Sequence, residues 1–399
     1  MRSDPAMRLP AFIQNLYYIT HINNLPSILR RGILCHERVI NERIPYSPIY
    51  DEEIMALRRA KVAPDGRSLW TFVNLYFNAR NAMLYRVIVE CGTDNLAVLA
   101  IRRDVVEREG VFISDGNAAH QESRILPKLD GLRAISNIKG ILERPWWASA
   151  DGSKRRMMAE CLIPDVVEPT NIVCVYVASN NVLTHVKTLL QREGVPIPRI
   201  VPEPNMFFAP VYRRQLTDVL SLVKGDMFFS RCHTLTVSVN CVGVMGKGLA
   251  STAKYRFPEV YVYYQDRCRS GELKLGRPVL YRREVSIDAD LADEPSRLTN
   301  GHTETWFLLF PTKHHWRERA NIDAIKSGLD WIVANYKQEG IKSLAVPALG
   351  CGEGWLDWKD VGPILCKSLS RLDIPVEVYL PAEKEVPEDQ RSREFLLDD

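Results

Sequence analysis

The chain has 399 residues, of which 46% are hydrophobic and 25% are charged. This ordinary globular composition excludes a disordered or repetitive chain, and the length predicts two domains. Because the formal net charge is only +3, any contact with nucleic acid must come from a local basic patch.

In its first half, the chain alternates short apolar runs with turn sequences. Leu16 to Thr20 predicts a strand, and Asn23 is placed to cap a helix that continues to Arg31. A second helix is predicted over Glu52 to Lys61. Apolar, β-branched runs predict further strands over residues 71–77, 84–91, 96–101, 157–163 and 172–177. Many strands with few long helices indicate an α+β domain.

Prolines cluster between Val201 and Gln215, and we place a domain boundary there, giving domains over residues 1–210 and 216–399. Strands and helices alternate beyond this boundary. Strands are predicted at 235–239, 305–310, 344–346 and 376–379, and helices at 247–256, 319–336 and 358–372. This alternation, with strands of the buried type, indicates a three-layer α/β domain. The charged tail after Pro381 is expected to fray.

Nine cysteines occur without a CxxC pair or a His–Cys cluster at metal-ligand spacing. We therefore expect reduced thiols, no metal site and a cytoplasmic location. The stretch from Met1 to Phe12 lacks the apolar core of a signal peptide, and the apolar runs are too short to cross a bilayer. No contact with a membrane is expected.

Two glycine-rich segments follow predicted strands of the second domain, NCVGVMGKG at 240–248 and ALGCGEGW at 348–355. Glycines at strand ends let backbone N–H groups turn toward a phosphate. Neither segment matches the Rossmann or P-loop pattern, and each taken alone is more simply a turn. Two such loops in one α/β domain favour a diphosphate site, because a diphosphate needs donors from two sides.

Together with Asp226 and the segment FPTKHHW at 310–316, these loops resemble the macrodomain of DarG-type antitoxins over about Thr217 to Leu380. The resemblance implies an α/β/α three-layer fold with a mixed sheet, which binds ADP-ribose and hydrolyses its bond to a DNA base. It implies that Asp226 binds the adenine and that Asn240 approaches the distal ribose. The glycines implied to hold the diphosphate are Gly246, Gly248, Gly350, Gly352 and Gly354.

Lys313, within the FPTKHHW segment, is the implied catalytic residue of this domain. A lysine amine can attack the anomeric carbon of ADP-ribose and form a Schiff-base-type intermediate. Without the motif, Lys313 would be interpreted as a solvated lysine before a helix. One position departs from the resemblance, because the family usually has a second glycine where this chain has Trp355. A bulky side chain there could narrow the pyrophosphate site or close over the ligand.

The first domain carries a second resemblance, which covers about residues 13–207. The segments YITHINNL at 18–25, YFNARNAMLY at 76–85 and MAECL at 158–162 resemble DarT, the toxin partner of DarG. DarT transfers ADP-ribose from NAD to a base of single-stranded DNA, and the fold implied is an α+β ADP-ribosyltransferase domain with a split β-sheet. The residues implied to act are catalytic Glu160 and Arg80 and NAD-binding Thr20, His21 and Asn24.

The chemistry of Glu160 supports this assignment independently. Breaking the glycosidic bond of NAD passes through an oxocarbenium-like state, which a nearby carboxylate stabilises. The alternative is an outward-facing strand residue, since an unpaired buried carboxylate is costly. For Arg80 the alternative is a surface arginine beside a turn, and for His21 it is a structural histidine.

Basic and aromatic residues precede Glu160 in the sequence. Trp147, Lys154, Arg155 and Arg156 combine phosphate neutralisation with base stacking, as a protein that binds single-stranded DNA requires. The alternative is a solvated loop with core tryptophans. In DarT-like enzymes the loop before the glutamate recognises the substrate, so we assign DNA binding to these four residues.

We therefore interpret the chain as a fused toxin and antitoxin, with the two domains also in contact within the chain. The first would modify a base, thymine in our interpretation, and the second would remove the modification. In one alternative the macrodomain only binds ADP-ribose or covers the toxin site. Trp355 favours this alternative, whereas Lys313 argues against it. In another, the transferase modifies RNA or protein.

Overall fold

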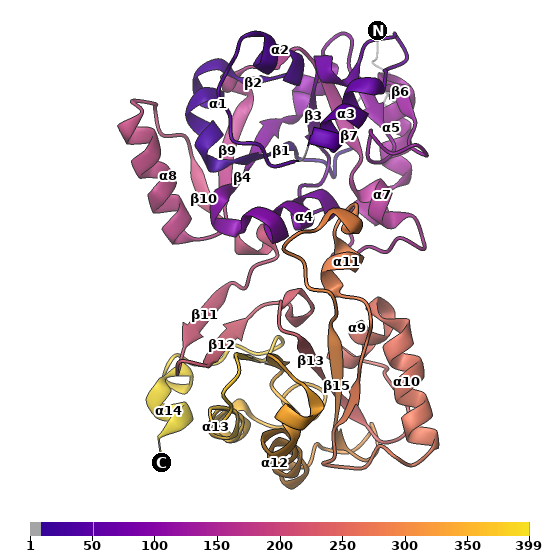
Figure 1. The fold of residues 1–399 in the computed structure, drawn as a ribbon, viewed down its shortest axis with the longest axis vertical. Helices are drawn as coiled ribbons and strands as arrows, with labels where there is room; N and C mark the ends of the chain where they lie inside the picture. Colours follow the sequence, from indigo (N-terminus) through magenta and orange to yellow (C-terminus); the bar gives the residue numbers. More distant parts are fainter. Residues whose placement is uncertain (1–8, 51, 399) are drawn as a thin grey trace. The chain divides into compact units, whose positions relative to one another are not determined.

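Two units divide the chain in the computed structural model, which describes residues 9–50 and 52–398 (Figure 1). The first unit runs to Ala209 and also includes Asp290–Gly301, and the second contains Pro210–Ala289 and His302–Asp399. The first unit is thus discontinuous in sequence. The predicted ranges 1–210 and 216–399 did not foresee that residues 290–301 belong to the first unit. The expectation for Met1 to Phe12 falls largely outside the described residues.

The first unit consists of one large sheet, one small sheet and the helices around them. Its strands are β1 (Asn15–His21), β2 (Ile33–Leu34), β3 (Phe72–Tyr76), β4 (Leu96–Arg102), β5 (Phe112–Ser114), β6 (Ile125–Pro127), β7 (Glu160–Pro164), β8 (Val166–Val167), β9 (Ile172–Val177) and β10 (Ile200–Pro202). Its helices are α1 (Leu25–Arg31), α2 (His36–Asn41), α3 (Glu52–Ala60), α4 (Ala82–Cys91), α5 (Lys128–Asn137), α6 (Lys139–Leu142), α7 (Ser153–Met157) and α8 (Asn180–Arg192). The large sheet has the order β10-β9-β4-β1-β3-β7-β5-β6, and β2 pairs with β8.

The large sheet is split between β1 and β3. β1 pairs with β4 along its whole length, and β3 pairs with β7 along its whole length, but β1 and β3 share only the register pair Tyr17 and Tyr76. This confirms the split β-sheet of the predicted α+β fold. The split matters for function because the strands on both sides of it line the same pocket.

One predicted strand of this unit is wrong. Residues 84–91 form most of helix α4, whose first turn is capped where the Asn81 side chain accepts a hydrogen bond from the Leu84 N–H at 3.0 Å. Gly92 ends the helix at a φ of 78°, which a glycine adopts readily. The β-branched residues of the run indicated a strand, and the two capping residues at its ends were the better signal.

The second unit is built on one sheet with helices on both faces. Its strands are β11 (Tyr212–Gln215), β12 (Leu220–Lys224), β13 (Thr234–Asn240), β14 (Val279–Tyr281), β15 (Trp306–Lys313), β16 (Leu344–Val346) and β17 (Val376–Tyr379). Its helices are α9 (Gly248–Arg256), α10 (Pro258–Arg269), α12 (Ile322–Glu339), α13 (Trp358–Leu369) and α14 (Arg393–Leu397), and α11 (Ile287–Leu291) spans residues of both units.

The sheet of this unit is mixed, with the order β11-β12-β17-β16-β13-β15-β14. The strands from β12 to β15 in that order are parallel to their neighbours, and β11 and β14 add antiparallel edges. This confirms the predicted three-layer macrodomain fold with a mixed sheet. Because the carboxyl ends of parallel strands lie at one edge, the loops after β13, β15 and β16 meet there.

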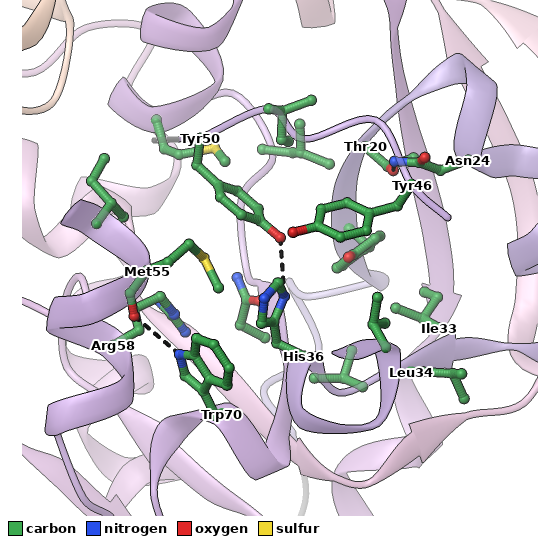
Figure 2. Close-up of a pocket in the computed structure, with 18 of the residues that line it drawn as sticks. Thr20, Asn24, Ile33, Leu34, His36, Tyr46, Tyr50, Met55, Arg58 and Trp70 are labelled. Atoms are coloured by element: carbon green, nitrogen blue, oxygen red, sulfur yellow. Dashed lines mark hydrogen bonds between the residues drawn. The ribbon is translucent and has the colours of Figure 1, made fainter. Parts of the chain in front are cut away.

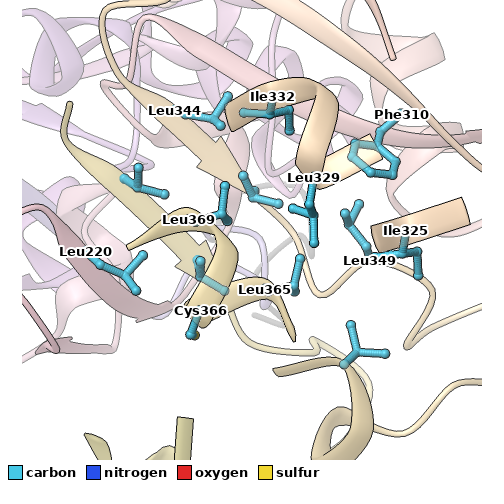
Figure 3. Close-up of a cluster of buried hydrophobic side chains, with 14 of the residues drawn as sticks. Leu220, Phe310, Ile325, Leu329, Ile332, Leu344, Leu349, Leu365, Cys366 and Leu369 are labelled. Atoms are coloured by element: carbon cyan, nitrogen blue, oxygen red, sulfur yellow. The ribbon is translucent and has the colours of Figure 1, made fainter. Parts of the chain in front are cut away.

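Helices α12 and α13 cover one face of this sheet and bury its main apolar cluster (Figure 3). Leu329 of α12 and Leu365 of α13 are fully buried in it, together with Leu344 of β16. Leu396 of α14 is also fully buried in this cluster, and the Ser392 hydroxyl caps α14 by accepting from the Phe395 N–H. The expected fraying of the whole tail after Pro381 is therefore wrong, because an apolar side chain near its end packs into the core.

Candidate active sites

A pocket lies at the split of the first sheet (Figure 2). Its lining includes Thr20 of β1, Tyr76 of β3 and Arg58 of α3. The cavity has a volume of about 150 Å³, whereas small-molecule sites typically enclose about 300–1,000 Å³. A dinucleotide would therefore require this pocket to widen.

Glu160 is the first residue of β7 and is fully buried. Its carboxylate accepts hydrogen bonds from both terminal nitrogens of Arg58, at 3.2 and 2.8 Å, and from the Ala118 N–H at 2.9 Å. Its own N–H donates to the Ser114 hydroxyl. The outward-facing alternative is thereby excluded, and the bidentate partner explains how a charged carboxylate is tolerated there.

Arg58 is a site residue that the sequence analysis missed. Burial acts to lower the pKa of its guanidinium, but the Glu160 carboxylate overcomes this effect and the pKa is raised above its ordinary value. Arg58 lines the pocket, whereas Glu160 is not among the lining residues. In this structure Arg58 thus connects the carboxylate to the pocket, and Glu160 can meet a ligand directly only if Arg58 shifts.

Aromatic side chains surround Arg58 on the pocket wall (Figure 2). The His36 ring lies 4.4 Å from the Trp70 ring in an edge-to-face arrangement, and His36 Nδ1 is 3.2 Å from the Tyr50 hydroxyl. Burial raises the pKa of Tyr18 to about 12 and, together with the positive charge of Arg58, lowers the pKa of His36. This part of the wall therefore presents aromatic rings beside the Arg58 cation, as suits an aromatic or ribose-bearing ligand.

The predicted NAD-binding residues divide into two groups. Thr20 and Asn24 line the pocket, and the Asn24 amide donates to the Thr20 hydroxyl at 3.1 Å. The same amide accepts from the Ser47 N–H at 2.7 Å and so holds the segment that carries Tyr46 and Tyr50. His21 is not among the lining residues, and its Nδ1 accepts from the Asn23 N–H, which is the structural role considered for it.

The structure does not bring Arg80 to Glu160. Its guanidinium donates to the carbonyl oxygens of Asn205 and Pro145, both at 2.9 Å, and lies 4.6 Å from the centre of the Phe208 ring. Arg80 is not among the residues that line the pocket. The cation beside the glutamate is Arg58, and its helix α3 was predicted without any role for it.

Residues 290–301 belong to the first unit although the sequence on either side of them belongs to the second. Asp293 forms an ion pair with Arg86 of α4 at 2.8 Å, and both side chains are buried. Asp293, Glu294 and Arg86 also line the first pocket. A buried pair of this kind costs about 3–5 kcal/mol when one partner is removed, so the segment is an integral part of this unit.

Two of the predicted DNA-binding residues lie beneath this segment. Trp147 is 2% exposed, and its Nε1 donates to the Leu291 carbonyl at 2.9 Å. Lys154 is also buried, and burial lowers its pKa while Asp293 and Asp290 act to raise it. Neither side chain is therefore on the surface of this structure, which a contact with DNA would require.

Arg155 and Arg156 are placed differently from each other. Arg155 lies 3.4 Å from the Asp115 carboxylate and 3.0 Å from the Ser123 hydroxyl, so it organises the turn between β5 and β6. Arg156 is exposed. Of the four predicted DNA-binding residues, Arg156 is the one that the structure leaves accessible to a phosphate.

A larger cavity, of about 1,120 Å³, lies at the edge of the second sheet where β13, β15 and β16 end. The residues predicted for the macrodomain all line it, namely Asp226, Asn240, Gly246, Gly248, Lys313, Gly350, Gly352 and Gly354. The structure therefore brings these residues together at one pocket, and its volume suits a nucleotide-sized ligand.

Lys313 ends β15 and is only 9% exposed. Its Nζ donates to the carbonyl oxygens of Glu353 at 2.6 Å and of Trp316 and Glu318 at 3.2 Å. Burial lowers the pKa of this amine, against a smaller opposing effect of the Glu353 and Glu318 carboxylates. A lowered pKa increases the fraction of neutral amine, which is the nucleophilic form.

Asn240 and Asp226 are both held by neighbouring groups. The Asn240 side chain accepts from the Val242 N–H and the Tyr264 hydroxyl and donates to the Val244 carbonyl, so it shapes the first glycine loop. Asp226 pairs with Arg256 at 2.8 Å and accepts from the Phe228 N–H. These hydrogen bonds and this ion pair fix the orientation of both side chains at the pocket.

The second glycine loop is tightly folded. A Cβ on Gly354 would lie 2.5 Å from the Gly350 carbonyl oxygen, so only glycine fits there. Trp355 follows with a φ of 56°, in the left-handed region that a bulky residue rarely occupies. This backbone geometry would suit a glycine, and it shows that the tryptophan is accommodated at the expense of strain.

The comparisons with known proteins agree with this division of sites. A profile described as ssDNA thymidine ADP-ribosyltransferase, DarT, matches residues 17–208, and the Macro domain profile matches residues 301–365. A DNA ADP-ribosyl transferase–DNA ADP-ribosyl glycohydrolase fusion protein of Thermosipho africanus is 50% identical over 386 residues, which are 96% of this chain and 98% of that protein.

Two further similarities concern a solved structure and a single-function relative. The structure of Thermosipho africanus DarTG in complex with ADP-ribose superposes with a TM-score of 0.88 at 49% identity and covers 96% of this chain and 99% of the other. A DNA ADP-ribosyl glycohydrolase of Mycobacterium bovis is 35% identical over 159 residues, which are 40% of this chain and 41% of that protein. Within residues 9–50 and 52–398, each helix is too short or too polar to cross a bilayer.

Proposed function

Because the chain belongs to the family of fused DNA ADP-ribosyl transferases and DNA ADP-ribosyl glycohydrolases, we propose that its two pockets attach and remove one modification of single-stranded DNA. The first unit transfers ADP-ribose from NAD to a thymine base, and the second hydrolyses the bond between base and ADP-ribose. The observation that carries this proposal is that each unit holds one buried ionisable side chain beside a pocket, Glu160 behind Arg58 in the first and Lys313 in the lining of the second. We assign the transferase to residues 1–210 together with 290–301, and the glycohydrolase to the rest of residues 216–399.

In the transfer step, the bond between the anomeric carbon and nicotinamide breaks and nicotinamide leaves with the electron pair. The carbon then bonds to a ring nitrogen of the base, which loses its proton. Glu160 stabilises the positive charge on the ribose, and Arg58 positions its carboxylate and supplies a cation at the pocket. Thr20 and Asn24 contact NAD from β1 and the adjoining turn, and His21 supports that turn.

In the removal step, the neutral amine of Lys313 attacks the same anomeric carbon and the base leaves with the electron pair, taking up a proton. Water then releases ADP-ribose and restores the lysine. The two glycine loops hold the diphosphate from either side, with Gly246 and Gly248 on one loop and Gly350, Gly352 and Gly354 on the other. Asp226 contacts the adenine and Asn240 fixes the first loop beside the distal ribose.

Both steps run downhill, because transfer uses the energy of the nicotinamide bond and removal is a hydrolysis. The extent of DNA modification is therefore set by the relative rates of the two sites. Such a balance suits a toxin and antitoxin in the cytoplasm, and the described structure, in which all nine cysteines are free, is compatible with a reducing compartment.

A second candidate for the role of the C-terminal half is steric restraint. Residues 290–301 cover Trp147 and lie beside Lys154, and they place the acidic side chains of Asp293 and Glu294 at the first pocket. Glu294 adds a carboxylate to this pocket, whereas the charge of Asp293 is balanced by Arg86, which lines the same pocket. The observation favours restraint in addition to removal, and the two effects are separated in the Discussion.

Labelling with isotopically marked NAD tests the substrate of the first unit. We expect a Lys313→Ala protein to label single-stranded DNA containing thymine and to leave duplex DNA, RNA and added protein unlabelled. Arg156→Gln in the same background should weaken labelling more at low salt than at high salt, because one lost phosphate contact lowers the salt slope of single-strand binding by about 0.7. Label in RNA or protein instead of DNA would contradict the assignment.

The second unit should show a characteristic pH dependence. Since the amine of Lys313 must be neutral to attack, the hydrolysis rate should rise with pH and level off at a pKa below the ordinary value of about 10.4. Single-turnover hydrolysis of a modified oligonucleotide, measured from about pH 6 to about pH 10 in a Glu160→Ala background, reports this rise. A rate that falls across this range would exclude the lysine amine as nucleophile.

A further inference from the structure

The two exposed tryptophans of this chain lie at one pocket. Of the eight tryptophans in the sequence, all within the described residues, only Trp316 and Trp355 are exposed, by 43% and 59%. Both line the macrodomain pocket, on the loops that follow β15 and β16. Large aromatic side chains left in solvent beside a ligand pocket are typical of binding surfaces rather than of core packing.

The backbone at Trp355 adds a second, independent observation. Its φ of 56° lies in the left-handed region, where a residue other than glycine is strained. The indole does not recover this through burial, because 59% of the residue is exposed. Strain that persists at a ligand pocket without an evident gain in packing is characteristic of residues retained for function.

The position of the ring defines what it could contact. The Lys313 Nζ lies 5.6 Å from the centre of the Trp355 ring, on the ring face. In the proposed removal step this amine attacks the anomeric carbon, and the modified base is attached to that carbon by one bond of about 1.5 Å. The base therefore lies within a few bond lengths of the amine, in the same part of the pocket as the Trp355 ring.

Trp316 extends this surface along the pocket mouth. The Arg317 guanidinium stacks 4.5 Å from the Trp316 ring centre, and the Trp316 carbonyl accepts a hydrogen bond from the Lys313 amine. Arg317 and Lys247 are exposed cations that line the same pocket, together with the carboxylates of Glu353 and Glu383. Aromatic rings interleaved with cations at a pocket mouth match the chemistry of a single nucleic-acid strand.

We propose that Trp355 stacks on the base that carries ADP-ribose, and that Trp316 with Arg317 holds the adjoining strand. This proposal deepens the proposed function of the second unit and rests on it for the identity of the substrate. The tryptophan that replaces the usual glycine is then a specificity residue, which selects ADP-ribose joined to single-stranded DNA over ADP-ribose alone. It does not obstruct the pyrophosphate site.

Binding measurements test this separately from catalysis. We use the Glu160→Ala, Lys313→Ala protein, which should neither add nor remove the modification, and a synthetic oligothymidine with one ADP-ribosylated base. Replacing Trp355 by Gly should weaken binding of this oligonucleotide at least about tenfold, as expected for the loss of one base–aromatic stacking contact. The affinity for free ADP-ribose should stay within about threefold, because the glycine loops are retained.

Two matched variants control for folding and for shape. Trp355→Gly removes the strain at a φ of 56°, so its melting temperature should be equal or higher, and a loss of binding cannot be assigned to misfolding. Trp355→Phe keeps an aromatic face and should retain most of the affinity for the oligonucleotide. Tyr255→Ala removes another exposed aromatic, outside the residues that line the pocket, and should change neither affinity.

The alternatives give different results. Unchanged binding of the oligonucleotide, or tighter binding, in Trp355→Gly would overturn the proposal, and tighter binding would identify the indole as an obstruction. An equal loss for free ADP-ribose would place Trp355 on the ligand instead of the base. If Trp355 is needed for binding but the protein with an intact Lys313 does not hydrolyse the modified oligonucleotide, the stacking surface stands and the catalytic assignment of the second unit fails.

Discussion

Replacing Lys313 by Ala should turn a tolerated protein into one that kills the bacterial cell expressing it. The transferase would continue to modify DNA, and no amine would remain at the second pocket to attack the anomeric carbon. Modified bases would then accumulate until replication fails. Colony survival after induction measures this effect, and we expect a loss of several orders of magnitude relative to the unchanged chain.

Two matched variants determine whether the amine is responsible. Lys313→Arg keeps a cation and hydrogen-bond donors for the Glu353, Trp316 and Glu318 carbonyl oxygens, but a guanidinium stays protonated and is not a nucleophile. It should therefore be as toxic as Lys313→Ala. Adding Glu160→Ala to Lys313→Ala should restore survival, because nothing is then transferred.

Steric restraint predicts a different outcome. If the C-terminal half acts only by covering the first site, Lys313→Ala should remain harmless and leave DNA unmodified. Deleting everything after about Val211 is not a clean test of restraint, because it also removes residues 290–301. Arg86 would lose Asp293 and remain as a buried, unpaired cation, with an expected loss of about 3–5 kcal/mol of stability.

The second large effect is expected at Glu160. Glu160→Ala should reduce NAD-dependent labelling of DNA by at least about 10²–10³-fold, since it removes the carboxylate that stabilises the ribose cation. Glu160→Gln keeps the shape but loses the charge, and it should retain little activity. Labelling with marked NAD in a Lys313→Ala background measures both variants without loss of product to the second site.

An Arg58→Lys variant distinguishes a role of Arg58 in catalysis from a role in stability alone. Arg58→Lys keeps one positive charge but loses the planar guanidinium whose two nitrogens donate to the two oxygens of Glu160, so labelling should fall while NAD is still bound. A stability measurement accompanies it, because Glu160 without its partner is a buried carboxylate held by Ala118 alone among its present contacts. Normal labelling by Glu160→Ala would remove the carboxylate from the mechanism.

Much of the fold could be predicted from local patterns. The strand over residues 96–101 was predicted because its residues are continuously apolar, and all of them are fully buried in β4. The run at 84–91 was misassigned because its β-branched residues favour a strand, although Asn81 and Gly92 mark a capped helix. The order at Leu396 could not be seen, because one apolar residue in a charged tail does not reveal the core that it enters.

The two sites differ in how far the sequence defines them. In the macrodomain the ligand surface is made of loops between consecutive strands, so short motifs report it directly and Lys313 falls among its lining residues. In the first unit, Glu160 is held by Arg58, which lies 102 positions earlier in the chain on a separate helix. No local pattern links such a pair, and Arg80, which stands in the motif, instead binds the Asn205 and Pro145 carbonyl oxygens.

The same limit applies to the predicted DNA-binding residues. Their composition suggested an accessible loop that binds single-stranded DNA, but Trp147 and Lys154 are buried against a segment from far along the sequence, Asp290–Gly301. An acidic segment that packs on basic residues cannot be identified from either stretch separately. Arg156 remains the exposed member and the one retained in the proposed DNA contact.

Mass spectrometry of a single-stranded, thymine-containing oligonucleotide tests the central claim most directly. After incubation with NAD and the Lys313→Ala protein, the account predicts an oligonucleotide heavier by one ADP-ribosyl group on a thymine. Adding the Glu160→Ala protein, whose Lys313 is intact, should return the original mass and release ADP-ribose. An oligonucleotide that gains no mass, or one whose added mass the second protein cannot remove, would contradict the assignment of opposed activities to the two units.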